Sequence, residues 1–139
     1  MRTRRSATAL AVAGASTTIL AVSAAPAAAQ TAAGVADNFY GSCDASVYVS
    51  DDLTGSPGKV EAWGGYTCPT SFDYVGQLRL TLRDGTATIG TDQKAVNGPT
   101  DHVDVTADNV SGVQNWHADL WIFRPGYDPT IVSTGEVRS

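Results

Sequence analysis

The chain has few of the features that mark metal centres, nucleic-acid-binding proteins and helical proteins. It contains two cysteines and two histidines in 139 residues and no C-x-x-C pair, so the usual spacing of a zinc site is missing. Its 9 basic side chains are outnumbered by 14 acidic ones, for a net charge of −5. Nucleic acid and anionic membrane bind through clustered lysine and arginine, so both are poor partners. After residue 29 no stretch has the apolar periodicity of a helix, which excludes a helical fold.

The first 29 residues have the three parts of a secretion signal. Three arginines stand among the first five residues, a small apolar run covers 7–22, and Ala27 and Ala29 form the small-x-small pattern that signal peptidase cleaves. The run is too short and too rich in alanine for a stable membrane span. The pair of arginines in "TRR" is followed by Ser-Ala-Thr rather than Phe-Leu-Lys, which favours the general secretion route over the twin-arginine route. The pattern predicts a secreted, extracellular protein, cleaved after Ala29.

Removal of the signal changes the charge and sets the domain organisation. Three arginines and no acid leave with residues 1–29, so the mature chain has 6 basic and 14 acidic side chains, a net charge of −8. About 110 residues remain, enough for one hydrophobic core and too few for two. We therefore predict a signal peptide over 1–29, an N-terminal segment over 30–42 and a single β-sandwich domain over 43–139.

The two cysteines, Cys43 and Cys68, both lie in the mature part. An even count in a small exported domain predicts a disulfide. A nucleophile or a metal ligand is the alternative, but neither cysteine has a histidine nearby in the sequence. The two thiols share the parity of the apolar residues around them, so both should point at the same face. The bond then joins neighbouring early strands or fastens two sheets at one edge, and its role is structural.

Apolar side chains in the mature chain alternate with a period of two. Leu78, Leu80 and Leu82, for example, alternate with Arg79 and Thr81, as in a strand with one buried face. Alternation of this kind and the turns between the runs predict seven strands, near 45–50, 59–68, 74–83, 86–91, 102–107, 115–123 and 130–137.

Turn residues separate these runs. Asp84-Gly85 stands between two alternating runs and predicts a hairpin. "SPGK" at 56–59 and "RPGY" at 124–127 place proline and then glycine where a type II turn needs them. Seven short strands in this length predict an all-β fold, a two-sheet antiparallel sandwich that is immunoglobulin-like in architecture, with one disulfide. A small barrel is the alternative. The cysteines are too close in sequence for the bridge of antibody domains.

The stretch "NWHADLWIF" at 115–123 has two different faces. Trp116 belongs to the wholly apolar parity and should lie in the core. The other parity contains His117, Asp119, Trp121 and Phe123, and turning it inward would bury two polar groups that need partners. The latter four side chains should therefore point outward or lie at a sheet margin.

An outward strip of this composition suits a binding surface. Flat aromatic rings beside a carboxylate and an imidazole can hold sugar rings or a protein partner, and Trp63, on the outward parity of strand 59–68, could extend the strip. The alternative is that a loop, a neighbouring tyrosine or the N-terminal segment covers the rings. Gly64-Gly65 also suggests a bulge, which would exchange the faces of Trp63's strand.

Catalytic and metal-binding patterns are weak. A set formed by Ser71, His117 and Asp119 lacks the elbow motif of serine hydrolases. His102 stands near Asp101 and Asp104, but these two acids have opposite parity, which favours a solvated acidic edge. "SDDLTGS" at 50–56 resembles a calcium loop only loosely, without the spaced ligands of an EF-hand. We predict no metal site and no cofactor.

The signal, "SCDASVYVS", "YTCP" and "VGQLRLTLRDG" together resemble small exported actinobacterial β-sandwich proteins of uncharacterised function. Exported inhibitors of amylases and proteases are similar in size and acidity, although the Trp-Arg-Tyr signature of the tendamistat type is absent. The sequence predicts a secreted, non-catalytic binding module or inhibitor that acts on an extracellular protein or polysaccharide, through the outward strip or the 51–58 loop. A small secreted hydrolase and a structural protein of the cell envelope or matrix are the alternatives.

Overall fold

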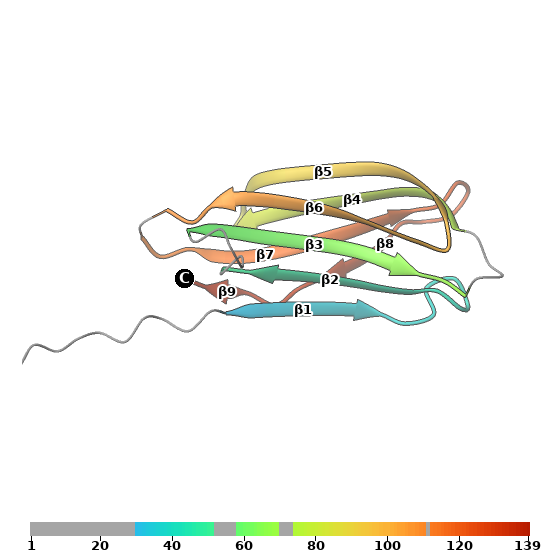
Figure 1. Cartoon of the computed structure of the whole chain (residues 1–139), viewed down its shortest axis with the longest axis horizontal. Coiled ribbons are helices and arrows are strands. Elements are labelled where there is room, and N and C mark those ends of the chain that lie inside the picture. Colours follow the sequence, from blue (N-terminus) through green and yellow to red (C-terminus); the bar gives the residue numbers. More distant parts are fainter. Residues whose placement is uncertain (1–29, 52–57, 70–73, 111) are drawn as a thin grey trace, which may run out of the picture.

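The computed structural model describes residues 30–51, 58–69, 74–110 and 112–139, and all the regular structure among them is β-strand (Figure 1). Sheet A has the strand order β1-β2-β3-β6, and sheet B the order β5-β4-β7-β8, with β9 also paired to β7. The strands are β1 (Thr31–Ala36), β2 (Asp44–Ser50), β3 (Lys59–Thr67), β4 (Tyr74–Asp84), β5 (Ala87–Gly98), β6 (Thr100–Asp108), β7 (Asn115–Phe123), β8 (Thr130–Ser133) and β9 (Val137–Arg138).

All strand pairs within the two sheets are antiparallel. The predicted all-β, two-sheet antiparallel sandwich is therefore confirmed, whereas the immunoglobulin-like arrangement within it is not. None of the described residues forms a helix that could cross a membrane.

One hydrophobic core fills the space between the sheets. Alternate residues of β4 and β7 turn large aliphatic side chains inward, and alternate residues of β2 and β3 meet them from sheet A. The largest of these fully buried side chains are Leu78, Leu80, Leu82, Leu120, Ile122, Val47, Val49 and Val60. Burying each such side chain contributes about 1.5–3 kcal/mol relative to leaving it exposed. The period of two in the sequence thus reports the face of each strand that the core covers.

Three parts of the strand prediction are wrong. The segment predicted over 30–42 contains β1, which the sequence hides because alanine, glycine and valine occupy both of its faces. The strand predicted over 86–91 continues to Gly98 as an edge strand, exposed on nearly every position, so that alternation gives no sign of it. In addition, the run predicted over 130–137 is two strands, β8 and β9.

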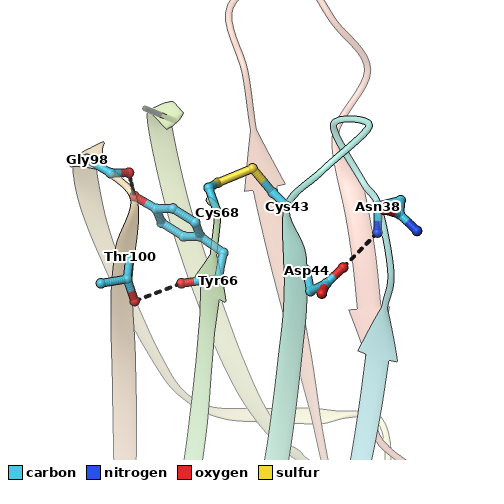
Figure 2. Close-up of a disulfide and its surroundings, with 7 residues drawn as sticks. All are labelled: Asn38, Cys43, Asp44, Tyr66, Cys68, Gly98 and Thr100. Atoms are coloured by element: carbon cyan, nitrogen blue, oxygen red, sulfur yellow. Dashed lines mark hydrogen bonds between the residues drawn. A yellow bond between two sulfur atoms is a disulfide. The ribbon is translucent and has the colours of Figure 1, made fainter. Parts of the chain in front are cut away.

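The Cys43–Cys68 disulfide is present and joins neighbouring strands of sheet A (Figure 2). Cys43 precedes β2 and Cys68 follows β3, and both side chains are buried, as their parity predicted. Beside the bond, the Tyr66 hydroxyl donates to the Gly98 carbonyl at 2.8 Å, and the Thr100 hydroxyl donates to the Tyr66 carbonyl at 3.1 Å. These contacts tie the corner between β5 and β6 to the same end of the sheet.

The bulge predicted at Gly64-Gly65 does not form. The pairing of β3 with both β2 and β6 passes through these glycines without a shift of register. Their lack of a side chain has another cause. A Cβ on Gly64 would lie 2.8 Å from the Leu120 Cδ1 of the opposite sheet, and one on Gly65 would lie 2.8 Å from the Trp63 ring. The two glycines make room for neighbouring side chains and leave the faces of β3 unchanged.

Two of the predicted turns are present in the structure. β4 and β5 form the expected hairpin, although its two-residue loop is Gly85-Thr86, one residue later than predicted. In the "RPGY" turn the Tyr127 amide donates to the Arg124 carbonyl at 3.1 Å, and Gly126 has φ of +82°, as position three of a type II turn requires. Residues 56 and 57 of "SPGK" lie outside the described residues.

Candidate ligand-binding surface

The two faces of β7 have the environments that the sequence predicted. Trp116 is 2% exposed and lies in the core, while the Trp121 and Phe123 side chains are partly buried on the outer face of sheet B. β4 lies beside β7, and its outward residues Arg79 and Gln77 are directly opposite Trp121 and Phe123. On the other side, Ile131 of β8 is opposite Trp121 and 48% exposed. The outward strip therefore has an apolar neighbour on one side and a cation on the other.

Arg79 covers part of the strip. The rings of Trp121 and Phe123 are nearly parallel, at 15°, with centroids 6.1 Å apart. The guanidinium carbon of Arg79 lies 4.9 Å from the Trp121 centroid and 5.1 Å from the Phe123 centroid, within the range of a cation–π contact. The Arg79 guanidinium therefore covers part of both rings.

An open hollow of about 430 Å³ lies beside Phe123. It is lined by Gly76, Gln77, Phe123, Arg124 and Pro125. The Arg124 guanidinium packs on two rings, with its carbon 4.5 Å from the Tyr40 centroid and 4.4 Å from the Tyr127 centroid. Arg79 and Arg124 were not singled out in the sequence. Parity placed Arg79 outward, but no sequence pattern shows which residue of the neighbouring strand it opposes.

His117 and Asp119 do not form an acid–base pair. The Asp119 carboxylate accepts from Arg83 Nε at 3.1 Å and from the Ser133 hydroxyl at 2.6 Å. The His117 Nδ1 atom is buried and has no hydrogen-bond partner among the described residues. Asp119 is thus held by its neighbours on β4 and β8 and does not orient the imidazole, as a catalytic dyad would require. Ser71, the third residue of the hypothetical hydrolase set, lies outside the described residues.

Trp63 does not extend the strip. It is on β3, which belongs to the other sheet (Figure 1). Its side chain is on the outward parity of that strand, so it faces the opposite side of the sandwich. There it is stacked between two rings from neighbouring strands, at 5.8 Å from Tyr48 and 5.6 Å from His102. The prediction that Trp63 continues the Trp121 strip is wrong because parity gives the face of a strand but not the sheet to which the strand belongs.

The outer face of sheet A is acidic. Its outward carboxylates include Glu61, which accepts from the Tyr48 hydroxyl at 3.2 Å, and Asp104, opposite Trp63. Burial first, and then the nearby charge of Glu61, raise the pKa of Tyr48 above its ordinary value. A hollow of about 170 Å³ beside Trp63 is lined in part by Asp37 and Asp44. It is smaller than the sites of about 300–1,000 Å³ that enclose small-molecule ligands.

His102 and its neighbouring acids do not converge on a metal. Asp101 accepts from Lys94 Nζ at 2.5 Å and from the His102 backbone amide at 2.9 Å, and the hydrogen bond from Lys94 is the main cause that lowers the pKa of Asp101. No group of three or more His, Cys, Asp or Glu side chains among the described residues is arranged to hold a metal ion. Residues 52–57, most of the loosely calcium-like stretch and of the 51–58 loop, lie outside the described residues.

Comparison of the chain with protein-family models, curated proteins and solved structures gives no match. The resemblance to exported actinobacterial proteins therefore stays a prediction.

Proposed function

We propose that this protein is an exported, non-catalytic binding module that engages an extracellular polysaccharide or protein through the outer face of sheet B. The observation that carries the proposal is the strip formed by Trp121 and Phe123. Its two nearly parallel rings have Arg79 beside them and an open hollow of about 430 Å³ at one end. That volume is within the range of about 300–1,000 Å³ typical of ligand sites.

The chemistry of the strip supports binding more than catalysis. Aromatic rings with amide and guanidinium donors beside them offer an apolar platform and directed hydrogen bonds, which suit a sugar ring or the side chains of a partner. A hydrolase would need a base oriented by an acid. Asp119 instead bonds to Arg83 and Ser133.

The signal pattern at 1–29 and the disulfide support export. Disulfides persist in oxidising compartments and are rare in the bacterial cytosol. The Cys43–Cys68 bond is therefore compatible with a protein that works outside the cell.

Retention assays with paired variants test the proposal. Purified protein would be passed over insoluble polysaccharides and over immobilised proteins from culture filtrate, and the bound fraction measured. We expect Trp121→Ala to lose at least tenfold in affinity, as removal of a central aromatic anchor does. Trp63→Ala is the matched control, because it removes an equally large, partly buried ring from the opposite sheet.

The two variants separate the possible results. Retention by wild type and Trp63→Ala, but not by Trp121→Ala, supports the site. If both variants are retained as well as wild type, the strip is not the site. A loss of retention confined to Trp63→Ala places binding on sheet A. Turnover of a retained polysaccharide would contradict the non-catalytic role.

A further inference from the structure

The basic side chains of this acidic protein differ in whether they pair with a carboxylate or pack on aromatic rings. After residue 29 the sequence has six of them, and all six lie within the described residues. Lys59, Arg83 and Lys94 each pair with an aspartate. Arg79 and Arg124 instead pack on aromatic rings, and neither has a carboxylate within ion-pair distance among the described residues.

Both arginines are neighbours of Phe123. Arg124 lines the hollow beside Phe123, and Arg79 lies over the Phe123 ring that forms one of its walls. The nearby carboxylates do not occupy them: Asp119 is bound to Arg83, and Asp128 forms no ion pair with Arg124 among the described contacts. In a chain with an excess of acid, the corner at Phe123 has guanidinium groups that no acid among the described residues neutralises.

The side chains around the hollow indicate the class of ligand that it suits. The Phe123 ring offers an apolar surface to the face of a sugar, and the Gln77 amide offers both a donor and an acceptor for hydroxyl groups. A guanidinium presents its donors in a planar fork that matches a carboxylate. Stacking on aromatic rings leaves the in-plane N–H groups of a guanidinium free to donate, so the contacts with Phe123, Tyr40 and Tyr127 orient the two arginines without using their donors.

We propose that the hollow beside Phe123 binds an anionic sugar residue, a uronate, whose ring packs on Phe123 and whose carboxylate is held by Arg124 and Arg79. The proposal rests on the binding function proposed above and adds the class of ligand to it.

The net negative charge of the protein does not prevent this binding. The outward carboxylates Glu61 and Asp104 are on sheet A, and the two sheets of a sandwich are about 10 Å apart before their outer side chains are counted. At an ionic strength of 0.15 M the Debye length is about 8 Å. The acidic face is therefore largely screened from a short ligand at Phe123, although a long polyanion would still be repelled.

A matched pair of probes tests the charge of the ligand. Trigalacturonic acid and its fully methyl-esterified form differ only in their carboxylates. Titration calorimetry at 0.15 M salt, with the exported protein, would measure the dissociation constant of each. We expect the acid form to bind at least tenfold more tightly than the ester.

Arginine variants then locate the site. Arg124→Met keeps a flexible apolar stem against the two tyrosines and removes the charge, so we expect it to weaken trigalacturonate binding at least tenfold. Arg138→Met is the control, since Arg138 is an exposed arginine of β9, away from the hollow. Circular dichroism of each variant would establish that the fold is kept.

Four results would overturn the inference: equal binding of acid and ester, no binding of either, equal effects of the two variants, or tighter binding of hexaglutamate, which would indicate an acidic peptide as the ligand. Each is separable from failure of the proposed function. A protein that retains a neutral polysaccharide through Trp121, yet does not discriminate trigalacturonate from its ester, keeps the function and loses only the anionic ligand.

Discussion

Trp116 and Trp121 are five positions apart on β7 and have opposite environments. Trp116 is 2% exposed and its indole N–H donates to the Ser139 hydroxyl at 3.1 Å. Trp116→Ala should therefore leave a large cavity and lower the free energy of unfolding by about 3–5 kcal/mol. Trp121 is only partly buried, and Trp121→Ala should cost about 1–2 kcal/mol, part of it the contact with Arg79.

Denaturant unfolding of both variants, followed by circular dichroism, measures the difference. A larger loss of stability in Trp121→Ala than in Trp116→Ala would mean that the register of β7 is one residue from the one described.

For single residues, the sequence predicted which face of a strand a side chain is on, but not which residue of a neighbouring strand it contacts. Parity alone predicted that Trp116 is buried and that Trp121 and Phe123 point outward. The contact with Arg79 depends on β4 lying beside β7 and on residue 79 being opposite residue 121. Both depend on long-range strand pairing, which a period of two does not encode.

Among the elements, β1 depends on one close approach. A Cβ on Gly34 would lie 2.9 Å from the carbonyl carbon of Ser133 on β8 and closer still to its oxygen, and a backbone group cannot move aside as a side chain can. Gly34→Val should therefore push β1 from β8 and lower the free energy of unfolding by about 2–3 kcal/mol, as overpacking does.

Ala33→Val adds bulk at the preceding position, where the side chain is exposed, and should change the free energy of unfolding by less than about 0.5 kcal/mol. Thermal unfolding of the two variants tests the contact. Equal melting temperatures would show that β1 does not pack closely on β8.

The strands that the sequence revealed are those with one face in the core. β4 and β7 alternate large apolar and polar residues and were placed to within a residue or two. β5 has little more than Val96 buried, so alternation indicated only its first half. β1 has small residues on both faces and shows no alternation. Hydrophobic patterning detects burial, and a strand held mainly by its backbone hydrogen bonds gives little signal of this kind.

Sheet A also contains a titratable contact, between Tyr48 and Glu61. The pKa of Tyr48 is raised above 10.0, first by burial and then by the charge of Glu61. Because the folded-state pKa exceeds the unfolded one, this contribution to stability is fully present below about pH 10. It is lost as the pH rises through the folded-state pKa.

Glu61→Gln removes the negative charge beside Tyr48 and should bring the pKa of Tyr48 back toward 10. Titration of the Tyr48 ring carbon by NMR measures the shift directly. Tyr127, which packs against Tyr40 and Arg124, serves as the internal reference. An unchanged Tyr48 midpoint would mean that Glu61 does not contribute.

For the molecule as a whole, the disulfide is a covalent constraint on the fold. It closes a loop between residues 25 apart in sequence, and in the chain-entropy model a loop of this size stabilises the fold by about 3.5 kcal/mol. Reduction, or Cys68→Ser, should lower the free energy of unfolding by about 2–5 kcal/mol. Urea unfolding with and without reductant measures this, and Cys68→Ser should not respond to the reductant.

The position of the disulfide also shows that the sequence did not predict which strands belong to which sheet. Parity predicted that both thiols face the core, but left open whether the bond joins neighbouring strands or two sheets. The assignment of strands to sheets decides this, and it also places Trp63 and Trp121 on opposite sides. Pairing of β3 with β6, across a separation of some 40 residues, is the long-range fact that no local pattern supplied.

The remaining prediction concerns Gln30, the first residue of the predicted mature chain. Gln30 is held at both its backbone and its side chain: its backbone nitrogen donates to the Asp51 carboxylate at 2.7 Å, and its side-chain oxygen accepts from the Arg138 amide at 3.3 Å. Cleavage after Ala29 would convert that nitrogen into an ammonium group beside Asp51. Mass spectrometry of secreted protein should find Gln30 at the N-terminus and a mass two hydrogens below the dithiol form.

Cleavage at this bond should then exchange a hydrogen bond for an exposed ion pair, worth up to about 1 kcal/mol. We expect Asp51→Asn to destabilise a chain that begins at Gln30 more than one that begins at Ala29, in which the Gln30 nitrogen is an uncharged amide. Melting temperatures of the four proteins, measured at low salt and again at 1 M salt, form the double comparison. The extra loss should shrink at high salt, because exposed charges are then screened. The same loss in both chains would show that the new terminus adds nothing to the contact, and a secreted chain that begins within β1 would place the cleavage elsewhere.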